Sequence, residues 1–213
     1  MHRRLILATA LVAGAAALPA AYREVRAQAA PSVPAAPPTR VRGTIAALEG
    51  NMLTVTSRDG QKMEITLTDP LTVLTVKKVE LSAIAPGSYI GTATRTGADG
   101  KLTALEVLVF PEAMRGAGEG HYGWDLEPGS MMTNGTVKGA VTAAAGRDLS
   151  IGFKDSGNTV HVPPGVPIVT FAPAERADLK PGAPVFVGAA KTPEGKLTAG
   201  RVVVGKDGVA PPM

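Results

Sequence analysis

Short runs of alternating apolar and polar residues recur along the chain after residue 39. Residues 62–67 read KMEITL and residues 148–153 read DLSIGF, so every second position in each run is apolar. A period of two places one face of a strand inward and the other outward. Arg58-Asp59-Gly60 and Asp155-Ser156-Gly157 adjoin these runs and suit hairpin turns, because glycine tolerates the positive φ that a tight turn needs. The pattern predicts an all-β fold.

The predicted strands fall into two groups of five, and no helix of appreciable length is predicted. The first group lies near residues 40–48, 52–57, 62–67, 89–96 and 103–109. The second group lies near residues 135–143, 148–153, 158–162, 184–190 and 197–204.

Four matching segments indicate that the two groups are copies of one unit. GKLTALEVLV at 100–109 matches GKLTAGRVVV at 195–204, and IAPG at 84–87 matches LKPG at 179–182. Upstream, SRDGQ at 57–61 matches KDSGN at 154–158, and VRGTIAALEGNMLTV at 41–55 matches VKGAVTAAAGRDLSI at 137–151. Four matches in the same order predict a duplication of about 70 residues per copy.

Five short strands with a longer crossing after the third are typical of a small OB-like barrel. In each crossing an apolar residue, Ile84 or Leu179, precedes Pro-Gly and is expected to plug the barrel. We therefore predict two tandem small five-stranded OB-like barrels, at 40–110 and 135–205, joined by a Gly-rich connector at 111–134 and followed by a tail at 206–213. The alternative is a two-sheet sandwich built from all ten strands.

The turn and core motifs resemble those of a known group of proteins. Val-x-Gly-x-Ile, a hairpin, Leu-x-Pro-Gly, and Gly-Lys-Leu-Thr-Ala before a last strand are similar to exported bacterial domains of unknown function, which have small OB-like barrels and often occur in tandem. The resemblance covers residues 41–110 and 137–205. It implies a fold and an exported protein, and it carries no active site.

The amino terminus has the order of residues that an export signal has. A basic head at 1–4 precedes an apolar run at 5–21, and Ala27-Gln28-Ala29 offers small residues for cleavage. We predict a signal peptide at 1–29, a Pro/Ala-rich tether at 30–39, and a periplasmic or secreted protein without a membrane span after cleavage. The alternatives are a retained anchor, and twin-arginine export from Arg3-Arg4.

Removal of this leader changes the charge balance. It leaves 18 Lys plus Arg and 17 Asp plus Glu, so the mature chain carries no strong field for nucleic acid or anionic lipid. The chain has no cysteine, which excludes disulfides, a thiol nucleophile and thiolate metal ligands. No nucleic-acid partner is expected, and the sequence assigns no oligomeric state.

The connector contains GEGHYG at 118–123, which has the G-x-G-x-x-G spacing of a dinucleotide-binding loop. That loop works only at the start of a helix, followed about 20 residues later by an acidic residue for the ribose. Here WDLEPG at 124–129 follows, which does not suit a helix. The glycines are therefore interpreted as a bend between the two copies.

The connector is also the chemically most diverse part of the chain. Trp124 and Tyr122 are expected either to wedge between the barrels or to contact a partner or ligand. Arg115 is expected to pair with Glu119 or Asp125. The candidate binding residues, for a small ligand or an envelope protein, are Arg115, His121, Tyr122, Trp124 and Asp125.

The resulting hypothesis is a non-enzymatic binding or structural module of the cell envelope that uses no cofactor. The first alternative is a periplasmic Cu- or Zn-binding accessory protein using the connector at 114–132, with His121 and either Asp125 or Glu119 as ligands. A methionine, Met131 or Met132, would be a soft ligand for Cu(I). The second is a hydrolase with a site between the barrels. His161 is expected to face solvent, because its strand directs Val160 and Val162 inward, so a metal site would need the fold to bring His161 or the surface of the second copy to His121.

Overall fold

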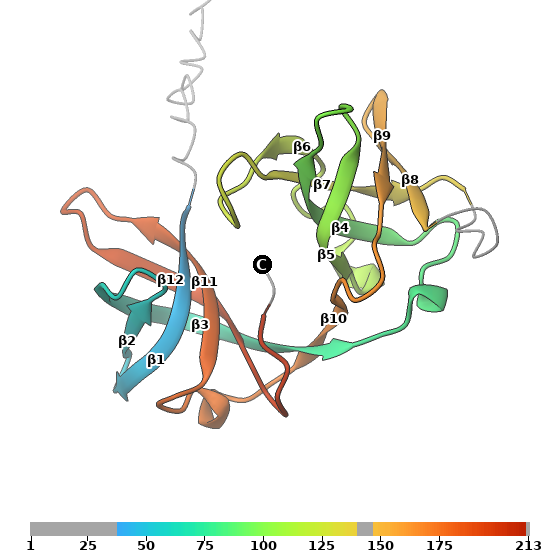
Figure 1. Cartoon of the computed structure of the whole chain (residues 1–213). Helices are drawn as coiled ribbons and strands as arrows, with labels where there is room; N and C mark the ends of the chain where they lie inside the picture. The colour runs from blue at the N-terminus through green and yellow to red at the C-terminus, as the bar shows by residue number, and fades with distance from the viewer. Residues whose placement is uncertain (1–37, 140–146, 212–213) are drawn as a thin grey trace, which may run out of the picture. The chain divides into compact units, whose positions relative to one another are not determined.

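The computed structural model describes residues 38–139 and 147–211, and within them the fold is all-β (Figure 1). Three single-turn 3₁₀ helices, η1 (Leu81–Ala83), η2 (Glu112–Met114) and η3 (Arg176–Asp178), interrupt the strands. The strands are β1 (Thr39–Glu49), β2 (Met52–Ser57), β3 (Lys62–Lys78), β4 (Tyr89–Thr96), β5 (Leu102–Val109), β6 (Gly120–Gly123), β7 (Met131–Val137), β8 (Asp148–Phe153), β9 (Ser156–His161), β10 (Ile168–Pro173), β11 (Pro184–Lys191) and β12 (Leu197–Val204).

Five of these strands form a closed barrel. Antiparallel ladders join β12 to β11, β11 to β1, β1 to β2 and β2 to β3, and a parallel ladder from β12 back to β3 closes the ring. Every strand of the ring is therefore paired on both sides, which leaves no exposed edge. We call β1, β2, β3, β11 and β12 the closed barrel.

The interior of the closed barrel follows the alternation of the sequence. Val41 and Ile45 of β1, Leu53 and Val55 of β2, and Ile65 of β3 are all at most 1% exposed. The residues that alternate with these inward-facing positions lie on the outer face of the closed barrel. Arg40 and Arg42, which flank Val41, are examples. Gly43 is required in β1 because a Cβ there would lie 2.0 Å from the carbonyl oxygen of Thr56 in the neighbouring strand.

The closed barrel is built from a different set of strands than the sequence predicted. Five strands within 40–110 were expected to close on one another, but only β1, β2 and β3 of that segment belong to the closed barrel. β11 and β12, from near the carboxyl end, complete it. Neighbouring strands in space thus come from both predicted copies.

The remaining predicted strands pair among themselves. β4 pairs with β5 and β7, β8 pairs with β7 and β9, and two residue pairs join β5 to β9. We call β4, β5, β7, β8 and β9 the middle strands. Their core is built from buried apolar residues: Ile84, Ile90, Ala104, Val107, Val137, Leu149, Ile151, Val160, Val162 and Ile168.

Two segments missed by the periodicity connect the closed barrel with the middle strands. β3 continues to Lys78, well beyond its predicted end at 67, and β10 pairs with both this extension and β5. A third apolar cluster forms beside them from Val76, Leu108, Val169 and Val203, against which Trp124, Phe171 and Phe186 pack. Aromatic residues therefore gather between the two groups of strands.

Several local predictions are confirmed. Each of the ten predicted strands overlaps an observed one, and the expected plugs Ile84 and Leu179 are 4% and 3% exposed. The strand expected at 135–143 instead begins at Met131 and ends at Val137.

The signal peptide, most of the tether, residues 140–143 and the last two residues of the tail lie outside the described residues. Among the described helices, none is long and apolar enough to span a membrane.

Candidate functional site

Two of the five predicted binding residues, Tyr122 and Trp124, line a cavity that the closed barrel and the middle strands share. Tyr122 lies in β6, and Trp124 follows that strand, with its backbone N–H donated to the carbonyl oxygen of Ser130 at 2.8 Å. The two rings meet edge to face, with centroids 6.2 Å apart. The Tyr122 hydroxyl accepts a hydrogen bond from Asn134 Nδ2 at 3.2 Å. The segment formed by β6 and Trp124 therefore places both aromatic residues at the cavity wall.

Asp125 holds two arginines of β1 against Trp124. The Asp125 carboxylate lies 2.9 Å from Arg42 Nη1 and 3.7 Å from Arg40 Nη1. The guanidinium carbon of Arg40 lies 3.9 Å from the centroid of the Trp124 ring, within the range of a cation–π contact. Burial lowers the pKa of Arg42, although the neighbouring Asp125 opposes that shift. The connector is thereby fastened to the outer face of the closed barrel.

The cavity beside Trp124 has a volume of about 450 Å³. Its walls are mainly apolar and come from both groups of strands: Leu108, Phe110, Met132, Phe171, Phe186 and Val203. Polar side chains are fewer: Arg40, Glu106, Tyr122, Asn134 and Arg201. We call this the Glu106 pocket. An apolar cavity with a few polar groups is the usual form of a small-molecule site.

Glu106 is the most unusual residue in this pocket. It lies in β5, next to a bulge where the ladder with β4 shifts register between Ala93 and Thr94, and its side chain is only 1% exposed. Desolvation raises the pKa of Glu106 to about 7, and the positive charges of Arg42 and Arg58 oppose that rise. Its Oε2 atom has no hydrogen-bond partner among the described residues.

Two further polar atoms of the pocket-lining residues are buried without a partner in the described part of the chain. They are Trp124 Nε1, which is a donor, and Asn134 Oδ1, which is an acceptor. Native proteins rarely leave such groups unpaired, because each costs about 1–3 kcal/mol. Three unpaired groups around one cavity are the main reason to regard it as a binding site.

The other two predicted residues lie away from the pocket. Arg115 pairs with Glu112, at 2.7 Å from Oε2, rather than with Glu119 or Asp125, and it also donates to the carbonyl oxygen of Gly87 at 2.9 Å. The three-residue helix η2 places Glu112 and Arg115 on the same side, which explains the change of partner. His121 contacts Thr133 Oγ1 at 2.8 Å through Nδ1 and stacks on Phe153.

The connector does not gather the residues proposed for a metal site. Glu119 accepts a hydrogen bond from the backbone of Lys154 at 2.9 Å, whereas Asp125 is engaged by the two arginines. Met132 is buried and Met131 only partly so. Among the described residues no group of three or more His, Cys, Asp or Glu side chains is placed to hold a metal ion.

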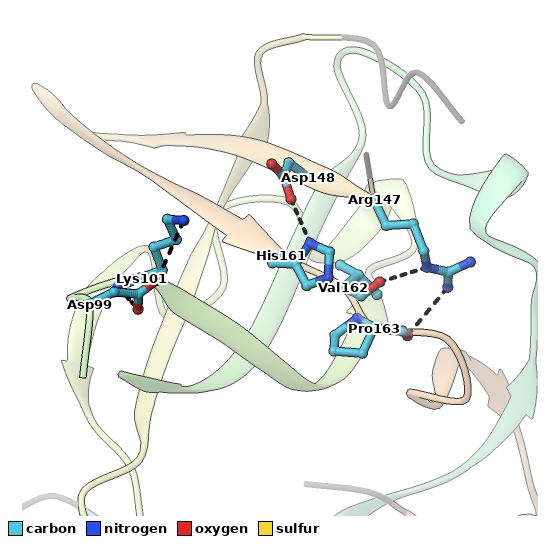
Figure 2. Close-up of polar contacts among 7 residues, drawn as sticks. All are labelled: Asp99, Lys101, Arg147, Asp148, His161, Val162 and Pro163. Atoms are coloured by element: carbon cyan, nitrogen blue, oxygen red, sulfur yellow. Dashed lines mark hydrogen bonds and ion pairs between the residues drawn. The ribbon is translucent and has the colours of Figure 1, made fainter. Parts of the chain in front are cut away.

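A larger cavity, of about 580 Å³, lies at the junction of β5 and β9 (Figure 2). His161 Nδ1 lies 2.7 Å from Asp148 Oδ1 there, and Asp99 pairs with Lys101 at 3.4 Å. His161 is exposed between two buried valines, as expected. Because these charged groups pair with one another and are well exposed, the smaller Glu106 pocket is the stronger candidate despite its size.

Sequence reasoning missed Glu106, Arg40, Arg42 and Asn134. A signal for Glu106 was present, because LTALEVLVF at 102–110 places one acidic residue within an otherwise apolar strand. The arginines gave no comparable signal, since alternation alone assigned them to solvent. Comparison of the sequence with protein-family models, curated proteins and solved structures finds no significant match.

Proposed function

We propose that this chain is a non-enzymatic binding protein of the bacterial cell envelope that holds a small molecule in the Glu106 pocket. The observation that carries the proposal is buried Glu106, a residue of the cavity wall whose Oε2 atom has no hydrogen-bond partner in the described chain. A polar group of a ligand would satisfy it, together with Trp124 Nε1 and Asn134 Oδ1. The export signal predicted at 1–29 supports the envelope location.

The composition of the pocket favours binding over hydrolysis. Glu106 is the only acidic residue among the described residues that line it, and they include no histidine, serine or lysine. Hydrolysis commonly needs a nucleophile or a water-activating base with a second group to orient it. A single buried carboxyl surrounded by aromatic rings is better suited to recognition.

We further propose that the fold is a pair of OB-like barrels produced by duplication, with segments exchanged between the copies. Each copy then contributes three strands to one barrel and two to the other. The register supports this, because Gly43 of β1 pairs with Val185 and Gly135 of β7 pairs with Ile90. The resemblance to exported tandem OB-like domains supports it too.

Gly43 and Gly135 have equivalent surroundings, which further supports the proposed duplication. A Cβ on Gly43 would lie 2.0 Å from Thr56 O, and one on Gly135 would lie 2.4 Å from Gly152 O. RGTI at 42–45 therefore corresponds to NGTV at 134–137, and not to KGAV at 138–141 as the sequence alignment suggested. The start of the second copy moves four residues toward the amino terminus.

Co-purification tests the binding function. The protein is purified from its native compartment, then denatured, and the released small molecules are identified by mass spectrometry. Gly188→Leu provides a blocked pocket, because Gly188 lines the cavity and a Cβ there meets no atom within 4 Å. Ala190→Leu is the matched control, since Ala190 is exposed in the same strand and is not part of the cavity wall.

A molecule that is released from the wild type and from Ala190→Leu, but not from Gly188→Leu, is the expected result. Thermal shifts with a fragment library, recorded on the same three proteins, provide a second measurement if the native ligand is lost in purification. If no molecule distinguishes Gly188→Leu from the other two proteins in either experiment, the Glu106 pocket is not a binding site.

A further inference from the structure

The pocket's unpaired groups define which ligand chemistry it accepts. On the basis of the proposed binding function, we propose that the Glu106 pocket selects an aromatic molecule bearing an N–H donor group of the primary carboxamide type, and discriminates against aromatic acids. Three features support this assignment: the unpaired polar atoms of the pocket, its aromatic wall and its distribution of charge.

The unpaired atoms comprise two acceptors and one donor. Asn134 donates from Nδ2 to the carbonyl oxygen of Ala117 and to the hydroxyl of Tyr122, both at 3.2 Å, so that its Oδ1 is left as an acceptor. Ionised Glu106, the form present above its pKa of about 7, offers Oε2 as the second acceptor, and Trp124 Nε1 is the donor. A primary carboxamide has two N–H donors and one carbonyl acceptor, which is the complement of this set.

Gly91 leaves room beside the unpaired acceptor of Asn134. A Cβ on Gly91 would lie 2.5 Å from Asn134 Oδ1 and 3.0 Å from Phe110 Cε2. Any larger residue would therefore push against the amide that the ligand is proposed to meet. Gly91 itself lines the pocket and is buried, so its missing side chain leaves the space in which Asn134 Oδ1 lies.

The aromatic wall favours a flat apolar body. Phe110 and Phe171 pack edge to face with centroids 6.0 Å apart, and both line the cavity with Phe186 and Trp124. Aromatic rings prefer edge-to-face and offset-stacked neighbours, so an added ring can extend this arrangement. The polar groups would then orient the ring without supplying most of the contact area.

The distribution of charge disfavours an acid. Asp125 already engages Arg40 and Arg42, and Arg40 lies on the face of Trp124. At pH 8, above the pKa of about 7 of Glu106, an anionic ligand would meet a second negative charge or would require the carboxylate to take up a proton, and either costs binding free energy. Arg201 also lines the cavity, but its side chain is exposed and screened by solvent.

Benzamide and benzoate form a matched pair of probes, since they have the same size and shape and differ in donors and charge. Binding is followed by the emission of Trp124, the only tryptophan in the chain, and independently by ligand-observed NMR. At pH 8, where Glu106 is ionised, we expect benzamide to bind saturably and benzoate to bind at least about tenfold more weakly, because benzoate must repel the carboxylate or pay for its protonation. Equal binding, or tighter binding of benzoate, would overturn the inference.

Glu106→Leu tests whether the carboxyl is responsible, and it is expected to abolish the preference for benzamide while leaving the apolar wall in place. Glu64→Leu is the control, because Glu64 is exposed in β3 outside the pocket. If Glu106→Leu does not fold, Glu106→Gln replaces it, since the amide can donate to benzoate and should narrow the preference. An unchanged preference in the Glu106 variant contradicts the inference.

The same data separate this inference from the proposed function. If benzoate binds to the wild type as tightly as benzamide or more tightly, and Gly188→Leu blocks it, the pocket is a binding site but the selection for an N–H donor is wrong. If neither probe binds and the fragment library also fails to distinguish Gly188→Leu from the wild type, the binding function itself fails.

Discussion

Glu106 should make the stability of the protein fall as the pH rises from about 4.5 to about 7. Its folded-state pKa of about 7 lies above the ordinary value of 4.5, because burial disfavours the charged carboxylate. A group whose pKa is raised on folding contributes its full stability below the unfolded-state pKa and loses it as the pH passes the folded-state pKa. The window for Glu106 is therefore about pH 4.5 to 7.

The size of the effect follows from the two pKa values. A change from 4.5 to about 7 corresponds to about 3 kcal/mol in the free energy of unfolding. Solvent screening does not reduce this value much, since the side chain is only 1% exposed. Gln has nearly the same shape and does not ionise, so Glu106→Gln should lack this dependence.

Urea unfolding measured from pH 4 to pH 8 on the wild type and on Glu106→Gln tests this reasoning. Their difference in unfolding free energy should change by about 3 kcal/mol across the window, with the variant gaining relative stability at high pH. Glu64→Gln, which changes an exposed carboxyl, is the control for general effects of charge removal. A difference between wild type and Glu106→Gln that stays constant with pH would refute the assignment of a desolvated carboxyl.

Three other substitutions test the packing around the site by thermal and urea unfolding. Gly91→Ala should cost about 2 kcal/mol, because its Cβ would lie 2.5 Å from Asn134 Oδ1; unchanged stability would mean that this contact relaxes freely. Asp125→Asn should cost about 1 kcal/mol, a modest value because Asp125 is half exposed, by weakening its pairing with buried Arg42. Leu179→Ala should cost about 3 kcal/mol if Leu179 plugs the closed barrel, and a loss below 1 kcal/mol would contradict that role.

The sequence predicted local structure well because the closed barrel is amphipathic strand by strand. The alternation in KMEITL and DLSIGF specifies which face is buried, and the observed burial of Ile65 and Leu149 follows from it. β10 was missed because IVTFAP at 168–173 has both faces partly covered and so lacks a clear period of two. Periodicity reports burial on one face, and it fails where a strand packs on both.

Strand partners were harder to predict than strands. The two predicted copies have matching segments, so β11 and β12 can satisfy the same edges of β1 and β3 that β4 and β5 would. The alternation of buried and exposed side chains would be the same in either pairing. Which pair of strands closes the barrel therefore depends on the path of the long β3 and of the connector. The pocket was missed for the same reason, because Arg40 and Glu106 line one cavity only when strands from distant segments are brought together.

The proposed duplication also explains why the pocket has two unlike ends. The matching segments GKLTALEVLV and GKLTAGRVVV place Glu106 and Arg201 at equivalent positions, and both residues line the cavity. Gly91 and Phe186 are equivalent in the same way, each lying one residue after the partner of a β-strand glycine. Two identical copies would present the same groups from both sides of the pocket. In the proposed duplication, divergence instead leaves Glu106 and Gly91 on one side, and Arg201 and Phe186 on the other. Recognition of an asymmetric ligand requires such a difference between the sides, so the residues that differ between the copies are those in which specificity should be sought.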